Sequence, residues 1–412
     1  MNRPRVAYYS PLPPSRSGIA DYSALLLPEL SRRVDLTIAR PGRFKRAPSA
    51  DVCLYHVGND PDAHAWIVDE LRRRPGVVVL HELGLHHLVA GLTLARGDAD
   101  AYLDAMEHEA GLVGRLLAHA VIDNKIPPLW ETQPQDFPLV AEVLSKADGL
   151  IVHSRYVADA ARTRGYSGPI WQIPMPAWPT VAAAPERIDG APVIGCFGHL
   201  NASKRVPQLI AAFERVNGRR PDAALLLVGS ATRDVDALTL PSGVIREAYV
   251  PEERLWALMA ACDICVNLRS PTMGETSGSV IRQLSLGKPV VVSDVGWFGE
   301  LSDEVALKVR VDAGETETLY AALELLARDD GARASMSSAA LDLVRREHDL
   351  GRAADLYTAA LEQAAGGEAV ANQVLDDVSR AAADVGIEAG SPEAAELAQR
   401  LAEVELGRPF GG

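Results

Sequence analysis

Short apolar runs alternate with amphipathic segments through the first part of the chain. Apolar runs bounded by polar residues predict buried strands, and they occupy residues 6–9, 34–38, 52–54, 77–80 and 150–152. The spacing of apolar residues from Ile19 to about Ser31 predicts a helix. Strands with continuous apolar sequence are typical of a parallel sheet covered by helices on both faces. A helical insertion, interrupted at Pro127 and Pro128, separates His81 from the strand at residue 150.

A second alternating series begins at Val193. Apolar runs predict strands at residues 193–197, 224–228, 264–268 and 289–292, and amphipathic segments predict helices at about 205–217 and 252–261. Helical patterns then fill residues 315–364, 368–385 and 392–405. Residues 174–192 are rich in proline and alanine and have little periodicity, which is typical of a linker between domains.

These patterns predict an α/β protein with two Rossmann-like, doubly wound domains that face a central cleft. We place the first domain, with its helical insertion, at residues 1–178 and the second at residues 191–350. Residues 351–412 form a C-terminal helical extension that we expect to pack back on the domains. Because ligands of such sheets bind beyond the carboxyl ends of the strands, the polar residues at those ends are the candidates for function.

Composition excludes several classes of function. The 412 residues carry a net charge of −14, which disfavours nucleic acid as a partner and a polybasic membrane anchor. No apolar run reaches the length of about 20 residues that spans a bilayer, and the start shows no secretory leader. We therefore expect a cytoplasmic protein, with peripheral contact at the inner membrane face left open. The four cysteines are expected to be buried free thiols.

Glu275 is the strongest single candidate for chemistry. It lies between Gly274 and Gly278, in a loop that joins the strand at 264–268 to a helical pattern that starts near Val280. At a strand-to-helix turn the first N–H groups of the helix lack intrahelical partners and can bind an anion. The backbone of Thr276, Ser277 and Gly278 therefore predicts a phosphate site beside an acid.

A second candidate follows the strand at 193–197. Gly198 begins a loop that ends in Lys204 and Arg205 at the start of a helix, where the helix dipole is already positive. Two cations at this position are explained if a diphosphate neutralises them. A pair of solvated surface cations is the alternative. The glycine spacing does not match the fingerprint of a nicotinamide-binding site.

Two residues of the first domain are weaker candidates. Gly18 opens a helix after a polar loop, where a missing side chain lets backbone approach a ligand, although a simple tight turn fits equally. His81 closes the strand at 77–80, where a hydrogen-bonded core histidine is the alternative to a catalytic one. We reject a metal site at His81, His86 and His87, because adjacent helical histidines diverge and no carboxylate completes a face.

The ordered motifs between Val193 and Leu307 resemble the GT-B glycosyltransferases, specifically the large retaining family 4, also called glycosyl transferases group 1. The resemblance covers the Gly198 loop with its lysine, the residues 225–229, the residues 250–255, the Glu275 loop, and the residues 287–296. The first domain matches more loosely, through Gly18 and His81. The resemblance implies the GT-B fold and transfer of a sugar from a nucleotide diphosphate sugar.

The resemblance also implies roles for single residues. Lys204 and Arg205 would hold the donor diphosphate with help from the backbone at 276–278, and the loop of Val250 would meet the nucleobase. Glu275 matches the first glutamate of the E-x7-E pattern, which contacts the donor sugar, and His81 matches a histidine near the transferred sugar. Two positions depart from the family. Gln283 stands where the second glutamate would hold the ribose, and His199 stands where an arginine often joins the diphosphate site.

We therefore expect a retaining glycosyltransferase that uses a UDP- or GDP-sugar and requires no metal or cofactor. The leaving diphosphate would be stabilised by cations in place of Mg²⁺. A sugar-nucleotide epimerase with the same fold, or a nucleotide-sugar binding protein without activity, are the alternatives. A saccharide, a lipid-linked saccharide or another small hydroxyl compound would be the acceptor, as in polysaccharide biosynthesis.

Overall fold

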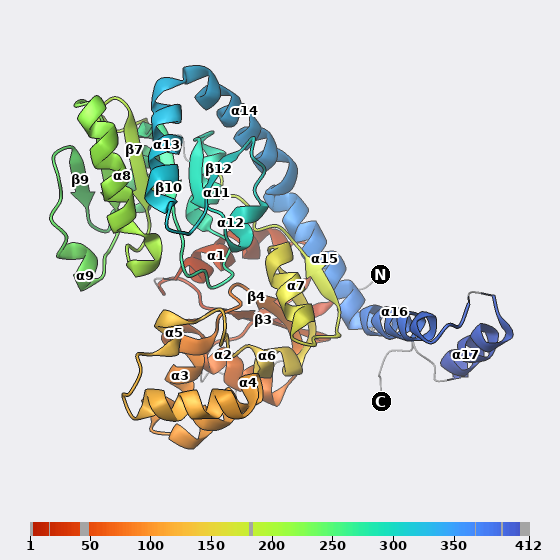
Figure 1. Ribbon diagram of the computed structural model, residues 1–412. Helices are drawn as coiled ribbons and strands as arrows, with labels where there is room; N and C mark the ends of the chain where they lie inside the picture. The colour runs from red at the N-terminus through yellow and green to blue at the C-terminus, as the bar shows by residue number, and fades with distance from the viewer. Residues whose placement is uncertain are drawn as a thin grey trace. The chain divides into compact units, whose positions relative to one another are not determined.

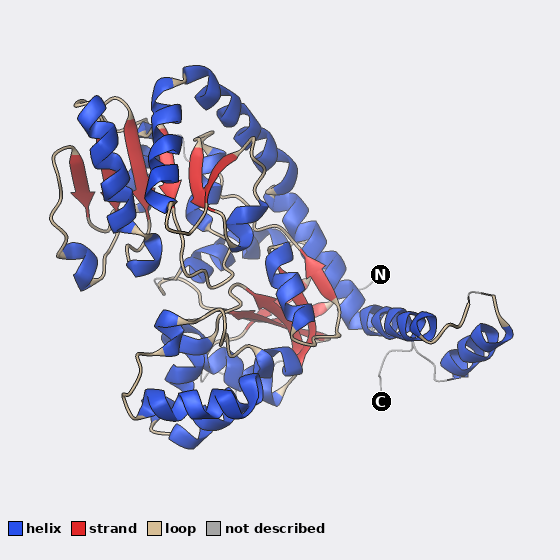
Figure 2. Cartoon of the chain, in the orientation of Figure 1, coloured by secondary structure: helices blue, strands red, loops and turns tan. Residues whose placement is uncertain are grey.

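The structure is a computed structural model that describes residues 3–15, 17–41, 49–180, 184–366, 368–388 and 390–403. The chain divides into two compact units. The first unit is Met1–Pro174 with Gly351–Gly412, and the second is Met175–Leu350. Each unit contains one six-stranded parallel sheet with helices on its faces (Figures 1 and 2). The predicted α/β, doubly wound class is confirmed.

The first unit is built on strands in the order β2-β1-β3-β4-β5-β6. All neighbouring strands are parallel, and the chain order reverses direction between β1 and β3. The strands are β1 Arg5–Tyr9, β2 Asp35–Ile38, β3 Val52–Val57, β4 Gly76–Leu80, β5 Ala147–Val152 and β6 Ile170–Gln172. The helices that connect them are α1 Gly18–Leu30, α2 Pro61–Arg73 and α7 Arg155–Thr163.

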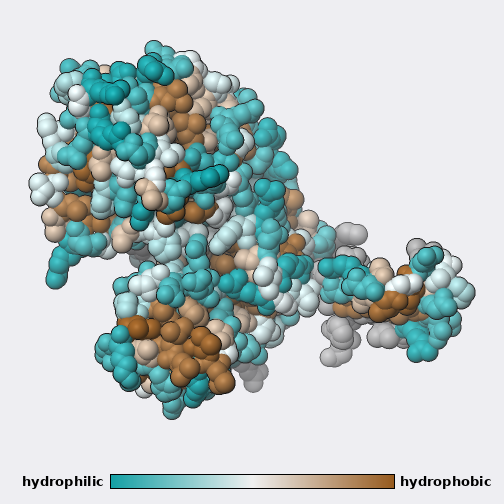
Figure 3. All heavy atoms as spheres, viewed as in Figure 1, coloured by the Kyte–Doolittle hydropathy of each residue, from teal (hydrophilic) through white to brown (hydrophobic). Residues whose placement is uncertain are grey.

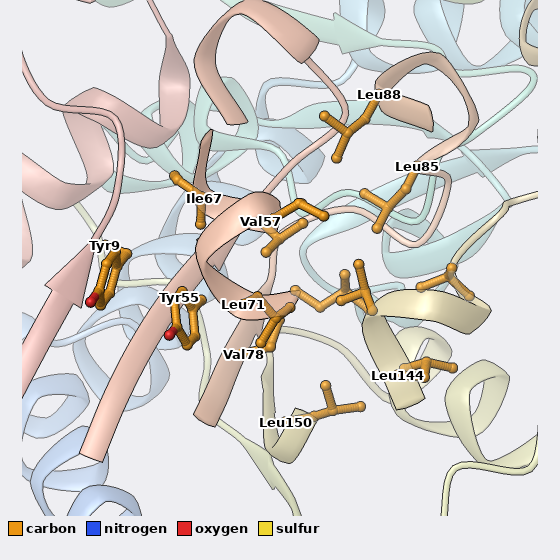
Figure 4. Close-up of a cluster of buried hydrophobic side chains, with 14 of the residues drawn as sticks. Tyr9, Tyr55, Val57, Ile67, Leu71, Val78, Leu85, Leu88, Leu144 and Leu150 are labelled. Atoms are coloured by element: carbon orange, nitrogen blue, oxygen red, sulfur yellow. The ribbon is translucent and has the colours of Figure 1, made fainter. Parts of the chain in front are cut away.

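Aromatic and aliphatic side chains from these strands and helices form the main core of the first unit (Figure 4). The predicted insertion between β4 and β5 is helical, with its own smaller core. Its elements are α3 His86–Leu92, the short 3-10 helix η1 Leu94–Arg96, α4 Ala99–Ile122, α5 Leu129–Thr132 and α6 Ala141–Lys146. Part of α4 leaves apolar side chains exposed, with Leu112 at 72% and Leu116 at 69% of full exposure. A brown apolar area marks this region in Figure 3.

The second unit has the strand order β12-β11-β10-β7-β8-β9, again with every pair parallel. The direction of chain order reverses between β7 and β10. The strands are β7 Val193–Phe197, β8 Ala224–Val228, β9 Val244–Glu247, β10 Ile264–Asn267, β11 Val290–Ser293 and β12 Ala306–Val309. The segments between them are η2 Ala202–Lys204, α8 Val206–Arg219, α9 Arg233–Asp236, α10 Glu252–Ala261, α11 Gly278–Ser285 and α12 Gly296–Glu300, and α13 Glu315–Arg328 and α14 Asp330–Glu347 complete the unit.

Three helices end the described chain: α15 Leu350–Gly366, α16 Glu368–Asp384 and α17 Pro392–Glu403. α15 packs on the first unit, where the hydroxyls of Tyr357 and Tyr22 lie 2.7 Å apart in the core. Arg33, three residues after the end of α1, also donates a hydrogen bond of 2.7 Å to Asp355. The last two residues of the helix predicted at 392–405 lie outside the described residues.

The predicted central strands all form, whereas β6, β9 and β12 were not predicted. These strands end the order of their sheets and are partly exposed, so they lack the continuous apolar sequence that marks a buried strand. The four cysteines are buried free thiols, as expected. Within the described ranges, every helix is too short or too polar to cross a bilayer.

Candidate active site

The loops that follow β7 and β10 meet at the carboxyl edge of the second sheet. β7 and β10 are adjacent strands, and Ser270 N donates to Ser203 O across the two loops at 2.8 Å. This is the point at which the strand order reverses, where open α/β sheets bind their ligands. The predicted donor residues of both motifs therefore lie on neighbouring loops at the expected edge of this unit.

Lys204 is a buried cation. Its side chain is only 3% exposed, and its Nζ donates a hydrogen bond of 2.9 Å to the backbone oxygen of Phe197. Burial, together with the positive charge of Arg269, lowers the pKa of Lys204 to about 8. Among the described residues, no carboxylate lies within ion-pair distance of Lys204. A buried amine without a carboxylate partner is a strong anchor for an anionic ligand.

Gly198 keeps space open beside this amine. Its φ of +106° lies in a region that favours glycine. A Cβ at this position would lie 3.6 Å from Lys204 Nζ and 3.5 Å from Ser279 Oγ. The missing side chain therefore leaves room between Lys204 and the first turn of α11.

The start of α11 offers backbone donors to the same space. Ser277 is the N-cap of the helix, and its Oγ accepts a hydrogen bond from Val280 N at 3.3 Å. This cap leaves the N–H groups of Gly278 and Ser279 without intrahelical acceptors. Thr276 and Ser277 are themselves mostly buried. The start of α11 therefore has backbone donors available, and the anion site there stays a prediction.

Glu275 is held in place by an ion pair and two hydrogen-bond donors. Its Oε1 lies 2.7 Å from Arg269 Nε. Its Oε2 accepts hydrogen bonds from Thr272 Oγ1 at 2.9 Å and from Met273 N at 2.8 Å. The side chain of Glu275 is 19% exposed. An ionised carboxylate accepts about four hydrogen bonds, and the two observed ones are both on Oε2, so Oε1 can accept a hydrogen bond from a ligand.

Arg269 is a site residue that the sequence analysis did not identify. It lies two residues after the end of β10, forms the ion pair with Glu275, and its Nη1 donates to Ser203 Oγ at 3.1 Å. Its charge also acts on Lys204. A cation placed immediately after an apolar strand was the available signal. Arg269 brings the second positive charge to this site from β10, whereas the prediction expected it from the loop after β7.

Arg205 has a different environment from the one predicted. It adopts the left-handed conformation with φ of +54° and forms an ion pair with Glu315, whose side chain is 3% exposed. The expectation that a diphosphate must neutralise Arg205 is corrected, because Glu315 of α13 already does so. The sequence could not show this pairing, since the two residues are 110 positions apart.

Three other predicted residues, His199, Val250 and Gln283, differ in how far they are exposed to a ligand. His199 is exposed, and its Nδ1 lies 2.9 Å from Ser230 Oγ. Val250 is 8% exposed and lies just before α10. Gln283 is fully buried, and its Oε1 accepts a hydrogen bond of 2.6 Å from Asn267 Nδ2. A ribose contact requires an exposed amide, so this placement does not support the predicted ribose role of Gln283.

The predicted residues of the first unit lie at the carboxyl edge of its own sheet. Gly18 begins α1, and a Cβ there would meet no atom within 4 Å, so packing does not require the glycine. His81 follows β4 and is 6% exposed. Its Nε2 lies 3.0 Å from Nδ1 of His56. The ring of Tyr22 meets the His81 ring edge-on, with 4.9 Å between the ring centroids. The centroid of the His153 ring lies 5.2 Å from that of the His81 ring.

His56, His81 and His153 end three adjacent strands, β3, β4 and β5. Burial lowers the pKa of His56 and of His81 well below the usual range, so both rings are neutral at pH 7. His81 could be singled out from the sequence, whereas His56 and His153 could not, because a lone histidine in an apolar run gives no signal of its neighbours. No group of three or more metal-ligating side chains occurs within the described ranges. Independence from metal stays a prediction.

Comparison with known proteins finds a family match within the second unit. Residues 191–329 match the family model described as glycosyl transferases group 1. The matched segment includes Gly198, Lys204, Arg269 and Glu275. No match was found among curated proteins.

Solved structures share the fold at low sequence identity. Sucrose-phosphate synthase from Thermosynechococcus elongatus is 17% identical, with a TM-score of 0.58 over 88% of this chain and 99% of that protein. HepE from Anabaena, solved in complex with UDP-glucose, is 16% identical, with a TM-score of 0.58 over 87% of this chain and 100% of the other. The pneumococcal O-GlcNAc transferase GtfA is 10% identical, with a TM-score of 0.52 over 76% of this chain and 57% of that one. The chain therefore has the fold of the GT-B glycosyltransferases, and its residues 191–329 match the glycosyl transferases group 1.

Proposed function

We propose that the protein transfers a sugar from a UDP- or GDP-sugar to a hydroxyl of a saccharide or lipid-linked acceptor, with retention of configuration and without a metal ion. The observation that carries the proposal is the buried amine of Lys204. It has no carboxylate partner among the described residues and lies beside Gly198, the start of α11 and Glu275. A diphosphate supplies the negative charge that this arrangement lacks.

The leaving diphosphate would be stabilised by fixed positive charge. Lys204 and Arg269 supply two cations, and the N–H groups of Gly278 and Ser279 supply oriented donors. Donors that are already in position stabilise charge that develops in the transition state without reorganisation. Removing one such donor typically costs about 100-fold to 1,000-fold in rate.

Glu275 would contact the transferred sugar. Thr272 and Met273 donate to its Oε2 and Arg269 forms an ion pair with its Oε1, so the carboxylate is fixed in orientation and Oε1 can still accept a hydrogen bond. A sugar hydroxyl donating to this oxygen would be oriented beside the phosphate site. The negative charge would also stabilise positive charge that develops near the anomeric carbon. In a retaining reaction, the leaving phosphate oxygen would take the acceptor proton on the same face of the sugar.

Two comparisons support the choice of donor. HepE was solved with UDP-glucose, and the pneumococcal GtfA was solved with UDP and GlcNAc. They share the fold of this chain, and a nucleotide diphosphate would supply the negative charge for the cationic site described for the second unit. Family 4 membership, a role in polysaccharide biosynthesis, a cytoplasmic location and peripheral membrane contact belong to the same proposal.

A donor screen tests the proposal directly. UDP, GDP and a panel of UDP- and GDP-sugars are added singly to the protein, and the melting temperature is measured with and without EDTA. A ligand present at 100 times its Kd stabilises the folded protein by about 2.7 kcal/mol. We expect one nucleotide series to raise the melting temperature, and we expect EDTA to leave the effect unchanged.

The selected donor is then offered to saccharide acceptors, and the anomeric configuration of the product is read by NMR. An α-linked donor should give an α-linked product. An inverted product would refute retention, isomerisation of the sugar without transfer would indicate an epimerase, and loss of transfer with EDTA would refute metal independence. If neither nucleotide series binds, the proposed donor site is wrong.

A further inference from the structure

The contact between His56 and His81 bears on which nitrogen of each ring carries the proton, as well as on the position of the rings. His56 is fully buried, and its Nδ1 lies 3.0 Å from His81 Nε2. The two rings stack at 5.2 Å with an angle of 29° between their planes. His64 Nδ1 donates to the backbone oxygen of His56 at 3.1 Å, which helps to hold that strand end in place. The short contact requires one ring to donate and the other to accept.

Because burial keeps both rings neutral at pH 7, each ring carries one proton and one free lone pair. Two arrangements satisfy the contact. In the first, His56 Nδ1–H donates to His81 Nε2, so the proton of His81 is on Nδ1. In the second, His81 Nε2–H donates to His56 Nδ1, so the proton of His56 is on Nε2.

The environment of His56 Nε2 distinguishes the two arrangements. This atom is buried and has no hydrogen-bond partner among the described residues. In the second arrangement it would be an N–H buried without an acceptor, which folded proteins almost never contain. In the first arrangement His56 Nε2 carries a lone pair and no proton, and the Nδ1–H of His56 has His81 Nε2 as its acceptor. The geometry therefore favours donation from His56 to His81.

We propose that His56 is a positioning residue that holds His81 as the Nδ1–H tautomer, so that His81 presents a hydrogen-bond donor to the ligand. His81 Nε2 is occupied by His56, which makes Nδ1 the only ring nitrogen left for a bound molecule. Tyr22 limits rotation of the ring by its edge-on contact, and Tyr357 holds the Tyr22 hydroxyl at 2.7 Å. A histidine in water prefers the proton on Nε2, so His56 reverses the ordinary preference.

This tautomer has a chemical consequence that rests on the proposed function. A nitrogen that carries a proton can donate to a sugar or phosphate oxygen, but it cannot accept a proton from the acceptor hydroxyl. His81 would therefore bind and orient an oxygen atom and would not act as the general base. The acceptor proton must then go to another group, such as the leaving phosphate oxygen.

NMR of the ring nitrogens tests the inference without any ligand. The protein is labelled with ¹⁵N-histidine, and the His81 signals are assigned by their loss in His81→Gln. We expect the ¹⁵N shift of a protonated nitrogen at His81 Nδ1 and that of an unprotonated nitrogen at Nε2. The reverse pattern would overturn the inference.

Two variants of His56 separate positioning from packing. His56→Phe keeps a ring but removes the donor, and we expect His81 to revert to the Nε2–H tautomer. His56→Asn places an amide N–H near the position of Nδ1, and we expect it to retain the Nδ1–H tautomer. His86→Phe is the matched control, because His86 is a buried histidine bonded to Phe137 O and to Tyr102, away from His81. An unchanged His81 tautomer in His56→Phe would refute the role of His56.

Turnover gives a second readout. With the nucleotide sugar selected by the donor screen, His56→Phe should lower kcat by about tenfold or more with the donor KM unchanged, and His56→Asn should recover most of the loss. Full turnover in His56→Phe, measured in a variant whose His81 has changed to the Nε2–H tautomer, would refute the functional part of the inference. If no nucleotide sugar binds, the proposed function fails while the tautomer measurement still decides the structural claim.

Discussion

Replacing Lys204 with methionine tests the donor site through two measurements that should move in opposite directions. Methionine has nearly the length of the lysine side chain and carries no charge. The buried amine lacks a carboxylate partner among the described residues, so its removal should stabilise the folded protein. The same change should abolish the response to a nucleotide, because the anion loses its buried cation.

The size of the stabilisation follows from the pKa of Lys204. Its value of about 8 in the folded protein lies below the ordinary value of 10.5. At pH 7 this difference corresponds to a cost of about 3 kcal/mol. The substitution also removes the hydrogen bond to Phe197, at a cost of about 1 kcal/mol, which leaves a net gain of about 2 kcal/mol. For a unit of this size the melting temperature should rise by about 4–8 °C.

The effect has a defined dependence on pH. Below about 8, Lys204 is protonated in both the folded and the unfolded chain, so the full cost is present. Between about 8 and 10.5 the folded protein releases the proton before the unfolded chain does, and the wild-type protein gains stability relative to the variant. Above 10.5 both forms are neutral, and the advantage of the variant should be lost.

Lys288→Met is the matched control for this experiment. Lys288 is half-buried and donates to the backbone oxygen of Ala260 at 2.7 Å. Its replacement removes a similar hydrogen bond without removing a fully buried charge, so stability should fall by about 1 kcal/mol. Thermal unfolding of both variants at pH 7, with and without UDP, gives all the readouts. A less stable Lys204→Met protein that still responds to UDP would refute the reasoning.

Four further predictions follow from the same contacts. The affinity for UDP-glucose should be constant below pH 8 and weaken about tenfold per pH unit above it, because the anion binds the protonated Lys204. Calorimetry from pH 7 to 9.5 measures this affinity, and a flat profile would contradict the assignment of Lys204 to the donor site. Arg269→Met should weaken UDP-glucose binding by about 10- to 100-fold through loss of a charge-assisted hydrogen bond. The pH above which binding weakens should also rise, because the arginine charge no longer lowers the pKa of Lys204. An unaltered Kd would remove Arg269 from the site. Glu275→Gln should lower turnover by about 100-fold or more and change donor affinity little, as judged by steady-state kinetics beside calorimetry; full turnover would exclude it from the mechanism. Arg205→Met should destabilise the protein by about 3 kcal/mol in urea unfolding, because Glu315 stays buried without its cation. The double variant Arg205→Met with Glu315→Gln should recover part of this loss. Both variants should still respond to UDP.

Much of the architecture could be predicted from the order of apolar segments. The central strands are buried on both faces, so each one appears in the sequence as a continuous apolar run. Glu275, Gly198 and Lys204 could be found because each follows such a run, and the carboxyl ends of parallel strands meet at one edge of the sheet. The partly exposed edge strands β9 and β12 gave no such run and were missed.

The partners of the charged and polar side chains were decided only by the tertiary structure. Arg205 pairs with Glu315 from α13, so it is not the free cation that its position suggested, and Arg269 approaches Lys204 and Glu275 instead. Gln283 turns inward to Asn267, although its place in the motif suggested a ribose contact. The sequence alone determined the layers of the fold and the edges where chemistry is placed, because apolar periodicity reports burial along each element. Ion pairs and hydrogen bonds depend on distances between side chains far apart in the chain, and these distances exist only after the sheets have formed.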